Sequence, residues 1–238
     1  MAKILVTGGA GFIGSHVADA YLAAGHAVAV VDNPIAGSKE NVPAAAAFYP
    51  VDIRSEELGA VFAREKPEYV SHLAAQIDVR RSLTEPLFDA DVNILGSLNV
   101  LEQSVAHGVR KFIFSSTGGA IYGEPKELPA TEACPPNPKC HYATSKLAFE
   151  FYLHLYHTLY ELPYVILRFP NVYGPRQSPE GEAGVCSILA GLMLRGQQPT
   201  LYGFGTPLRD YVYVGDIARA MVLALEKGDC VTLNLGSG

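Results

Sequence analysis

Residues 3–14 read Lys-Ile-Leu-Val-Thr-Gly-Gly-Ala-Gly-Phe-Ile-Gly, and this stretch decides the fold. Its first five residues form an apolar run that predicts a short strand, and the apolar residues after Gly11 recur at helical spacing. Gly8, Gly11 and Gly14 fall at every third position, and Gly9 completes a second glycine pattern with the last two. A strand, a tight turn and a helix N-terminus with free N–H groups together predict a site for a pyrophosphate.

Asp32 follows the next predicted strand, residues 27–31, and lies 18 residues beyond Gly14. This is close to the spacing of the carboxylate that binds ribose hydroxyls in dinucleotide-binding folds. A carboxylate there would repel a 2′-phosphate, so the sequence predicts NAD rather than NADP as cofactor. The alternative for Asp32 is a residue that only forms the turn at the end of the strand.

Strands and helices alternate as far as residue 170, which predicts an α/β fold with a doubly wound parallel sheet. A third strand is expected to end at Val51 and Asp52, and a fourth at residues 69–73 runs into Ala74 and Ala75. The carboxylate of Asp52 would lie near the adenine, and the two alanines would let the cofactor lie close to the backbone.

Helix boundaries and one further strand can also be predicted. Ser55 is expected to be the N-cap of a helix, and Gly108 is expected to end a long helical stretch from about Pro86. The fifth strand, residues 111–114, would carry Ser115, Ser116 and Thr117 to the carboxyl edge of the sheet, where open α/β folds bind their ligands.

Tyr142 and Lys146 are four residues apart in a predicted helix, so both side chains lie on one face. A tyrosine has an ordinary pKa of about 10, and a nearby ammonium lowers that pKa and favours the phenolate. The pair therefore predicts proton and hydride chemistry beside a bound dinucleotide. Thr117 is placed to hydrogen-bond both a substrate oxygen and Tyr142; the alternative is an ordinary hydroxyl at a strand end.

Taken together, these motifs resemble those of the extended short-chain dehydrogenase/reductases over the whole chain. The residues that carry the resemblance are residues 7–14, Asp32-Asn33, Asp52, His72-Leu73-Ala74-Ala75, Ser115-Ser116-Thr117, Tyr142 with Lys146, and Asn171-Val172-Tyr173-Gly174-Pro175-Arg176. The resemblance implies that Tyr142, Lys146 and Thr117 are catalytic. It implies cofactor contacts from Gly8, Gly11, Phe12, Ile13, Gly14, Asp32, Asn33, Asp52, Ile53, Leu73, Ala74, Ala75, Asn93, Ser115, Tyr142, Lys146 and Phe169.

Within that family the chain looks most like the epimerases that interconvert UDP-glucose and UDP-galactose at C4 through a 4-keto sugar. The resemblance implies a UDP-sugar substrate that contacts Thr117, Tyr142, Asn171, Thr200, Tyr202 and Arg209. Residues 200–203 would form a strand that lines the uracil pocket. Arg209 would bind the diphosphate, and its alternative is a surface salt bridge with Asp210 or Asp216.

The residues after Thr117 bear on the reaction type. Related dehydratases carry Asp-Glu there, and related decarboxylases a glutamate one residue further on, whereas this chain has Gly118 and Gly119. Without a further acid or base the site favours epimerisation over elimination. A UDP-glucuronate epimerase or decarboxylase stays open, as does another sugar-nucleotide-modifying enzyme of the family, for instance one that acts on N-acetylated UDP-sugars. A non-catalytic dinucleotide-binding module is a further alternative, although Tyr142, Lys146 and Thr117 argue against it.

The amino-acid composition limits the kinds of partner and location that are expected for this protein. The chain has 238 residues, a formal net charge of −6 and 49% hydrophobic residues, with a pI of about 5.6 and a mean hydropathy of +0.15. The acidic balance argues against a nucleic-acid partner. There is no apolar run of membrane-spanning length and no signal peptide at the start, so a cytoplasmic enzyme is expected. The four cysteines lack a C-x-x-C spacing, the histidines lack partners at metal-ligand spacing, and no metal is expected.

The domain organisation is expected to be an NAD-binding part at residues 1–170 and a smaller substrate-binding part at residues 171–238, with possible return segments to the sheet. Relatives that the resemblance implies run on past the strand expected at residues 231–235. Weakened affinity for the sugar nucleotide is therefore expected, with NAD binding retained.

The catalytic helix carries more apolar side chains than one core-facing side needs, which predicts a homodimer interface, the alternative being a helix buried on both sides. These side chains are Phe149, Phe151, Tyr152, Leu153, Leu155, Tyr156, Leu159 and Tyr160.

Overall fold

The computed structural model describes residues 1–33, 37–179, 184–206 and 208–237, apart from the side chains of Tyr202 and Phe204. Seven parallel strands form the central sheet in the order β3-β2-β1-β4-β5-β6-β9. Their bounds are β1 Lys3–Thr7, β2 Ala27–Val31, β3 Ala47–Tyr49, β4 Tyr69–His72, β5 Lys111–Thr117, β6 Tyr164–Phe169 and β9 Val231–Asn234. The order reverses between β1 and β4, and such reversals are where open α/β sheets bind ligands.

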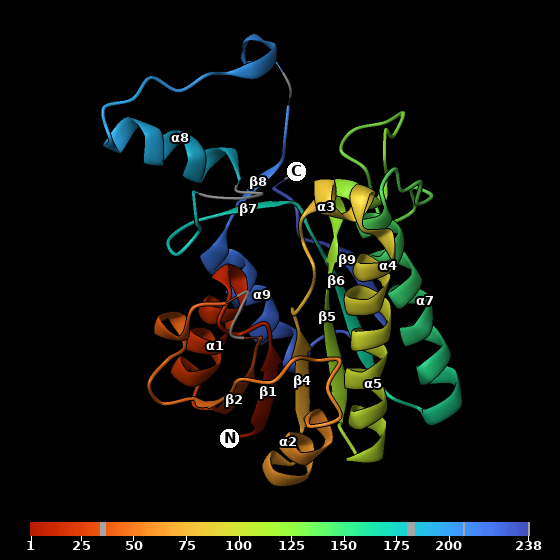
Figure 1. Ribbon diagram of the computed structural model, residues 1–238. Coiled ribbons are helices and arrows are strands. Elements are labelled where there is room, and N and C mark those ends of the chain that lie inside the picture. Colours follow the sequence, from red (N-terminus) through yellow and green to blue (C-terminus); the bar gives the residue numbers. More distant parts are fainter. Residues whose placement is uncertain (34–36, 180–183, 207, 238) are drawn as a thin grey trace.

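Helices cover both faces of the sheet, which explains why β5 and β6 are buried along their whole length. On one face lie α1 (Phe12–Ala23) and α9 (Val214–Glu226); on the other lie α2 (Leu58–Glu65), α5 (Ser97–Ala106) and α7 (His141–Tyr160) (Figure 1). Each layer forms its own apolar core, one around Tyr21 and Met221 and one around Phe62, Phe112 and Phe149. The predicted doubly wound α/β fold is confirmed.

The remaining elements lie mainly around the carboxyl edge of the sheet. They are α3 (Val79–Thr84), α4 (Pro86–Ala90), α6 (Gly118–Ile121) and α8 (Val185–Leu194), the π-helical turn η2 (Asp91–Gly96) and the 3-10 turns η1 (Lys39–Asn41) and η3 (Tyr202–Gly205). A second, two-stranded parallel sheet pairs β7 (Asn171–Tyr173) with β8 (Tyr211–Tyr213). In Figure 1, β7, β8 and α8 lie beyond the upper ends of the central strands.

The end of the third strand and the start of the helix after it differ from the prediction. The third strand ends at Tyr49 and not at Val51 and Asp52, because Pro50 has no N–H to donate and the N–H of Val51 bonds back to Tyr49 at 2.9 Å. Ser55 is not the N-cap of α2, which begins at Leu58 after Glu57; its Oγ instead accepts the N–H of Glu57 at 3.1 Å, in the turn before the helix.

The long helix predicted from Pro86 is interrupted. The π-helical turn η2 separates α4 from α5, and Gly108, with φ of +69°, follows the end of α5 as expected. Residues 200–203 were predicted as a strand, but the chain turns at Gly203 and Gly205, both with positive φ, and residues 202–205 form the 3-10 turn η3.

Candidate active site

The turn between β1 and α1 is shaped by its glycines. Gly8 has φ of +73°, a backbone conformation that glycine adopts without strain. A Cβ on Gly14 would lie 2.1 Å from the carbonyl oxygen of Gly8, so a side chain there would push the helix off the turn. The first turn of α1 therefore packs directly against the β1 end, with a cradle that fits the pyrophosphate of a dinucleotide.

Asp32 lines the dinucleotide cavity at the end of β2 and also braces the turn. Its Oδ2 accepts the N–H of Ala10 at 2.7 Å, and the side chain is buried. Burial raises the pKa of the carboxyl, opposed by hydrogen bonds from the N–H groups of Ala10, Asn33 and Gly11. The contact with the turn is a second role that the sequence reasoning did not assign, because it depends on how β2 and the turn pack.

The dinucleotide cavity has a volume of about 390 Å³ and lies over the reversal of strand order. Predicted residues line most of it: Gly8, Gly11, Phe12, Ile13, Gly14, Asp32, Asn33, Asp52, Ile53, Leu73, Ala74 and Ala75. Asn93 does not line this cavity. Its side chain is buried and forms two hydrogen bonds with the backbone of Gln76: Nδ2 donates to the carbonyl at 2.9 Å, and Oδ1 accepts the N–H at 2.8 Å.

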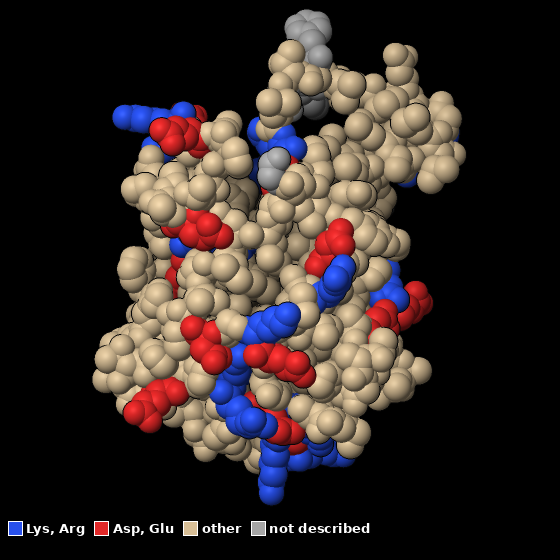
Figure 2. All heavy atoms as spheres, turned by 180° about the vertical axis from the view of Figure 1, so that it is seen from behind, with Lys and Arg blue, Asp and Glu red and all other residues tan. Residues whose placement is uncertain are grey.

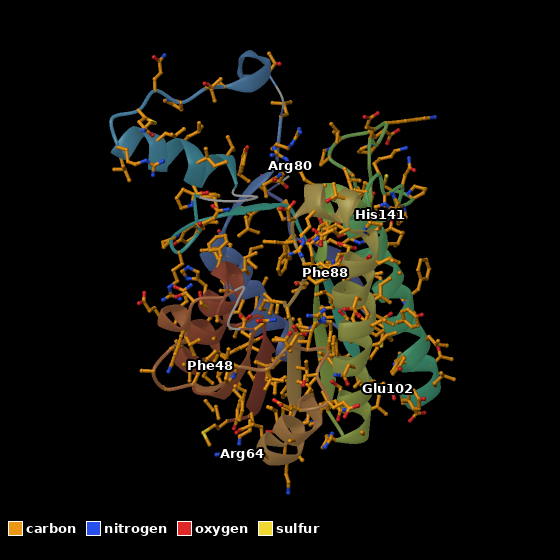
Figure 3. The ribbon with its side chains drawn as sticks, viewed as in Figure 1. Phe48, Arg64, Arg80, Phe88, Glu102 and His141 are labelled. Carbon is orange, nitrogen blue, oxygen red and sulfur yellow. The ribbon has the colours of Figure 1, made fainter. Side chains whose placement is uncertain are left out.

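Sequence reasoning missed two arginines in this cavity, Arg54 and Arg81. Arg54 forms ion pairs with Asp52 at 2.8 Å and Asp91 at 2.7 Å, and its hydrogen bonds hold the pKa of Asp52 down at about 2. The guanidinium of Arg81 lies 4.0 Å from the ring centroid of Phe88, which belongs to α4 near the upper part of the sheet (Figure 3). Because Arg54 is already neutralised by two carboxylates, it is poorly suited to a 2′-phosphate.

A second cavity of about 910 Å³ adjoins the first and shares with it Phe12, Ile13, Leu73, Ala75 and Ile77. Thr117 at the end of β5 lines it together with Tyr142 and Lys146 from the first turns of α7. That helix begins at the carboxyl edge, with His141 at its upper end (Figure 3). The structure thus brings the three predicted catalytic side chains together in the larger cavity, which adjoins the dinucleotide cavity.

Lys146 is buried on the face of α7 that meets β5. Its Nζ donates to the carbonyl of Ser115 at 3.0 Å and lies 4.7 Å from the ring centroid of Phe114. Burial lowers the pKa of the ammonium to about 8, while the carboxylates of Asp89 and Glu150 pull it upwards. This environment leaves the ammonium close to its titration point at neutral pH.

The pKa of Tyr142 differs from the expectation that Lys146 alone would depress it. Burial raises the pKa of the phenol to about 12, and Cys140 and Asp89 add to the rise, whereas a hydrogen bond with the side chain of Thr117 lowers it. The side chains of the chain alone therefore hold Tyr142 as a phenol, with Thr117 as the group that favours the phenolate.

The predicted substrate residues lie around the larger cavity. Asn171, Thr200 and Arg209 line it, as do Ser115 and Phe169 from the cofactor set. Arg209 forms no ion pair within the described ranges, and its Nη1 donates to the carbonyl of Leu208 at 2.7 Å. The side chain of Tyr202 lies outside the part of the chain that the structure describes.

Among the described residues, no group of three or more His, Cys, Asp and Glu side chains could hold a metal ion. None of the helices in those ranges is both long enough and apolar enough to cross a bilayer. On the face shown in Figure 2, basic and acidic side chains lie next to each other at several places.

Comparison with known proteins agrees with this geometry. The model of the NAD dependent epimerase/dehydratase family matches residues 4–236. A protein of Methanocaldococcus jannaschii called a putative UDP-glucose 4-epimerase is 47% identical over 99% of this chain and 77% of its own length. The UDP-glucose 4-epimerase of Mycolicibacterium smegmatis is 43% identical, with the same coverage.

Solved structures are similar in fold as well as in sequence. The UDP-glucose 4-epimerase of Thermotoga maritima with UDP-glucose superposes with a TM-score of 0.96, at 51% identity, over 98% of this chain and 76% of that one. The enzyme of Thermus thermophilus in complex with NAD gives a TM-score of 0.93 at 51% identity, over 99% and 78%. The chain therefore belongs to the NAD dependent epimerase/dehydratase family.

Proposed function

We propose that this protein is an NAD-dependent isomerase that interconverts UDP-glucose and UDP-galactose. The observation that carries the proposal is the larger cavity, which Thr117, Tyr142 and Lys146 line together with Arg209. It shares five lining residues with the adjoining cavity that holds the pyrophosphate cradle. The relatives and the two solved structures bear the name UDP-glucose 4-epimerase, one of them with UDP-glucose and one with NAD.

When bound, NAD supplies the hydride acceptor for C4 of the sugar and a positive charge beside the phenol. Tyr142 takes the proton from the sugar 4-hydroxyl and returns it after the 4-keto sugar has turned over. Thr117 shares its hydrogen bond between the phenol and the sugar oxygen. Lys146 holds ribose hydroxyls of the cofactor and adds a cation that favours the phenolate.

Two glycines after Thr117 support epimerisation over elimination. Gly118 and Gly119 form the start of α6, and neither can act as an acid or a base. The site then has one proton-transferring group, Tyr142, and that group suffices for removing and returning the proton at the sugar 4-hydroxyl.

The nucleotide sugar is expected to contact Asn171 and Thr200, with Arg209 on its diphosphate, since a guanidinium forms paired hydrogen bonds with phosphate oxygens. Residues 1–170 would hold the cofactor and residues 171–238 begin the substrate-binding part. Within the latter, α9 packs on the central sheet and β9 is the last strand of that sheet. A cytoplasmic location stays a prediction of the sequence.

A homodimer through α7 is part of the proposal. Phe149, Leu153 and Tyr156 face the core, while Phe151, Leu155 and Leu159 are 65%, 46% and 59% exposed. The three exposed side chains follow one another at intervals of four residues and so form an apolar stripe along the helix. The same helix on a second copy would cover that stripe.

The proposal is tested by incubating the purified chain with UDP-galactose, UDP-glucuronate or UDP-N-acetylglucosamine and separating the products by anion-exchange chromatography. We expect UDP-galactose and UDP-glucose to interconvert without added reductant, and bound NAD to be released from the denatured protein. Conversion of UDP-glucuronate with release of carbon dioxide would favour the decarboxylase alternative. Bound NAD with no change in any of the three sugars would favour a non-catalytic module.

A further inference from the structure

Asp89 is a fully buried carboxylate beside the catalytic helix. It lies on α4 and receives three side-chain hydrogen bonds. Ser145, between Tyr142 and Lys146 in the sequence, donates to its Oδ2 at 2.6 Å. Gln76 and Asn93 each donate to its Oδ1 at 3.1 Å. Both oxygens of the carboxylate therefore accept hydrogen bonds.

No cation lies within ion-pair distance of Asp89 in the part of the chain that the structure describes. The other buried carboxylate on this side of the sheet, Glu150, is neutralised by Arg168, whose Nη2 and Nε donate to it at 2.6 and 3.0 Å. The three donors to Asp89 are all uncharged. Its negative charge is therefore compensated only over a longer distance.

The negative charge of Asp89 acts on the buried ammonium of Lys146. That ammonium contacts the carbonyl of Ser115 and the aromatic ring of Phe114. Two carboxylates act on this ammonium, Asp89 on α4 and Glu150 on α7. His72 on β4 interacts with it as well, and burial holds the pKa of that imidazole well below its usual range. Tyr142 on α7 lines the same cavity, and Cys140, before α7, acts on Tyr142. Since Arg168 neutralises Glu150, Asp89 is the uncompensated anion of the group.

We propose that Asp89 is a positioning residue that anchors the first turns of α7 through Ser145 and supplies the negative charge that keeps Lys146 an ammonium ion. The inference rests on the proposed function only for the roles of Tyr142 and Lys146. Because Gln76 lines the dinucleotide cavity and bonds the same carboxylate, the anchor also ties that cavity to the catalytic helix.

The effect of the Asp89 charge on Lys146 is tested by titrating Lys146 directly, by NMR of the full chain labelled with 13Cε-lysine. Lys146→Arg identifies the resonance by its loss. In the parent we expect a midpoint near 8. In Asp89→Asn, which keeps the shape and removes the charge, we expect the midpoint to fall by about one pH unit. An unchanged midpoint in a folded Asp89→Asn protein would overturn the proposal.

Three further variants separate the charge of Asp89 from its contribution to packing. Ser145→Ala removes one hydrogen bond and keeps the carboxylate, so its midpoint is expected to match the parent, and a fall as large as that of Asp89→Asn would also overturn the proposal. Asp89→Ser replaces Asp89→Asn if circular dichroism shows that the latter does not fold, with the same fall expected. Glu68→Gln, at the opposite edge of the sheet, is the control for loss of a carboxylate.

The titration needs neither NAD nor a sugar nucleotide, so its outcome is independent of whether the chain converts UDP-galactose. In active protein, the pH profile of kcat for Asp89→Asn is expected to move to lower pH on both limbs, because loss of the anion lowers the pKa of Tyr142 and that of Lys146 together. Ser145→Ala is expected to reduce kcat without moving the profile.

Discussion

Catalysis requires opposite protonation states of Tyr142 and Lys146, which line the same cavity. The reaction requires the phenol to lose its proton and the ammonium to keep its own, yet burial pushes the pKa of the phenol up to about 12 and that of the ammonium down to about 8. Both shifts oppose the working charge states, so the hydrogen bond from Thr117 and the charges of bound ligands have to reverse them.

Tyr142→Phe keeps the ring and removes the proton-transferring oxygen. We expect kcat for UDP-galactose to fall by a factor of at least about 100, since general acid–base catalysis contributes about that much or more. The amount of NAD released from the denatured protein is expected to stay the same, which separates loss of chemistry from loss of cofactor. Turnover at the parental rate in the variant would contradict the assigned role.

Lys146→Met is expected to stabilise the fold while it abolishes activity. The pKa of Lys146 is about 8 in the folded chain and about 10.5 when unfolded, so below about pH 8 the folded state holds a buried ammonium at a cost. That cost disappears as pH rises through the window between the two values. Urea titration should show a gain of about 1–3 kcal/mol at pH 7 and little gain at pH 10.5. An equal gain at both pH values would show that packing, and not charge, is responsible.

Some residues of the site could be predicted because their chemistry is local in the sequence. The glycines of the first turn and the spacing of Tyr142 and Lys146 need only a strand, a turn and a helix. Asp89 and Arg54 could not be predicted in the same way, since each also has a distant partner that only the fold brings near. Ser145 lies 56 residues from Asp89, and Asp91 lies 37 residues from Arg54.

At the scale of elements, the junction of β1 and α1 depends on close approach of backbone to backbone. Gly14→Ala would place a methyl group 2.1 Å from the carbonyl oxygen of Gly8, so the helix must shift. We expect a loss of about 3 kcal/mol in the free energy of unfolding, measured in urea, and loss of bound NAD.

Gly59→Ala is the matched control for that change. The neighbour that its methyl group would meet is the far end of the Gln103 side chain, at 3.2 Å, which can move. We expect stability within about 1 kcal/mol of the parent and unchanged NAD content. Equal effects of the two substitutions would argue against close packing at Gly14.

A buried polar chain joins α7 to three strands. Ser116 of β5 and Arg168 of β6 both donate to Glu150, and Arg168 donates to the hydroxyl of Tyr122 at 2.6 Å. That hydroxyl in turn donates to Asn234 of β9 at 2.7 Å. The catalytic helix, the strand that carries Thr117 and the last strand are therefore held by one network.

Glu150→Gln would leave the guanidinium of Arg168 buried without an anion. Breaking a buried pair in this way costs about 3–5 kcal/mol, and we expect a loss of that size in urea unfolding. Glu68→Gln breaks the exposed pair with Arg110 and is expected to cost less than about 1 kcal/mol. A similar small loss in both variants would show that the network does not stabilise the fold.

Element types were easier to predict than their ends. The first two strands match the prediction residue for residue, because their apolar runs are bounded by polar or glycine residues. The third strand and residues 200–203 were misjudged because a proline and two glycines with positive φ override the local apolar pattern. The π-helical turn at residues 91–96 has no signal in the apolar periodicity.

At the scale of the whole molecule, the exposed stripe on α7 makes the oligomeric state testable. Phe151→Glu places a charge in the middle of the proposed contact, and we expect sedimentation at micromolar concentration to change from dimer to monomer. Leu223→Glu, on α9 at the other face of the sheet, is the control and is expected to leave the dimer intact. A parent that is monomeric under the same conditions would remove the dimer proposal.

The hydroxyl of Tyr21 on α1 contacts residues from widely separated parts of the chain. It bonds Ser71 at 2.7 Å and the carbonyl of Met221 on α9 at 3.2 Å, so α1 packs against a helix that is synthesised 200 residues later. During translation the first 200 residues can therefore assemble six of the seven strands of the central sheet while one side of α1 stays open to water. The nascent chain is expected to become resistant to protease at residues 12–23 only after α9 has left the ribosome, although the glycine turn itself was made first.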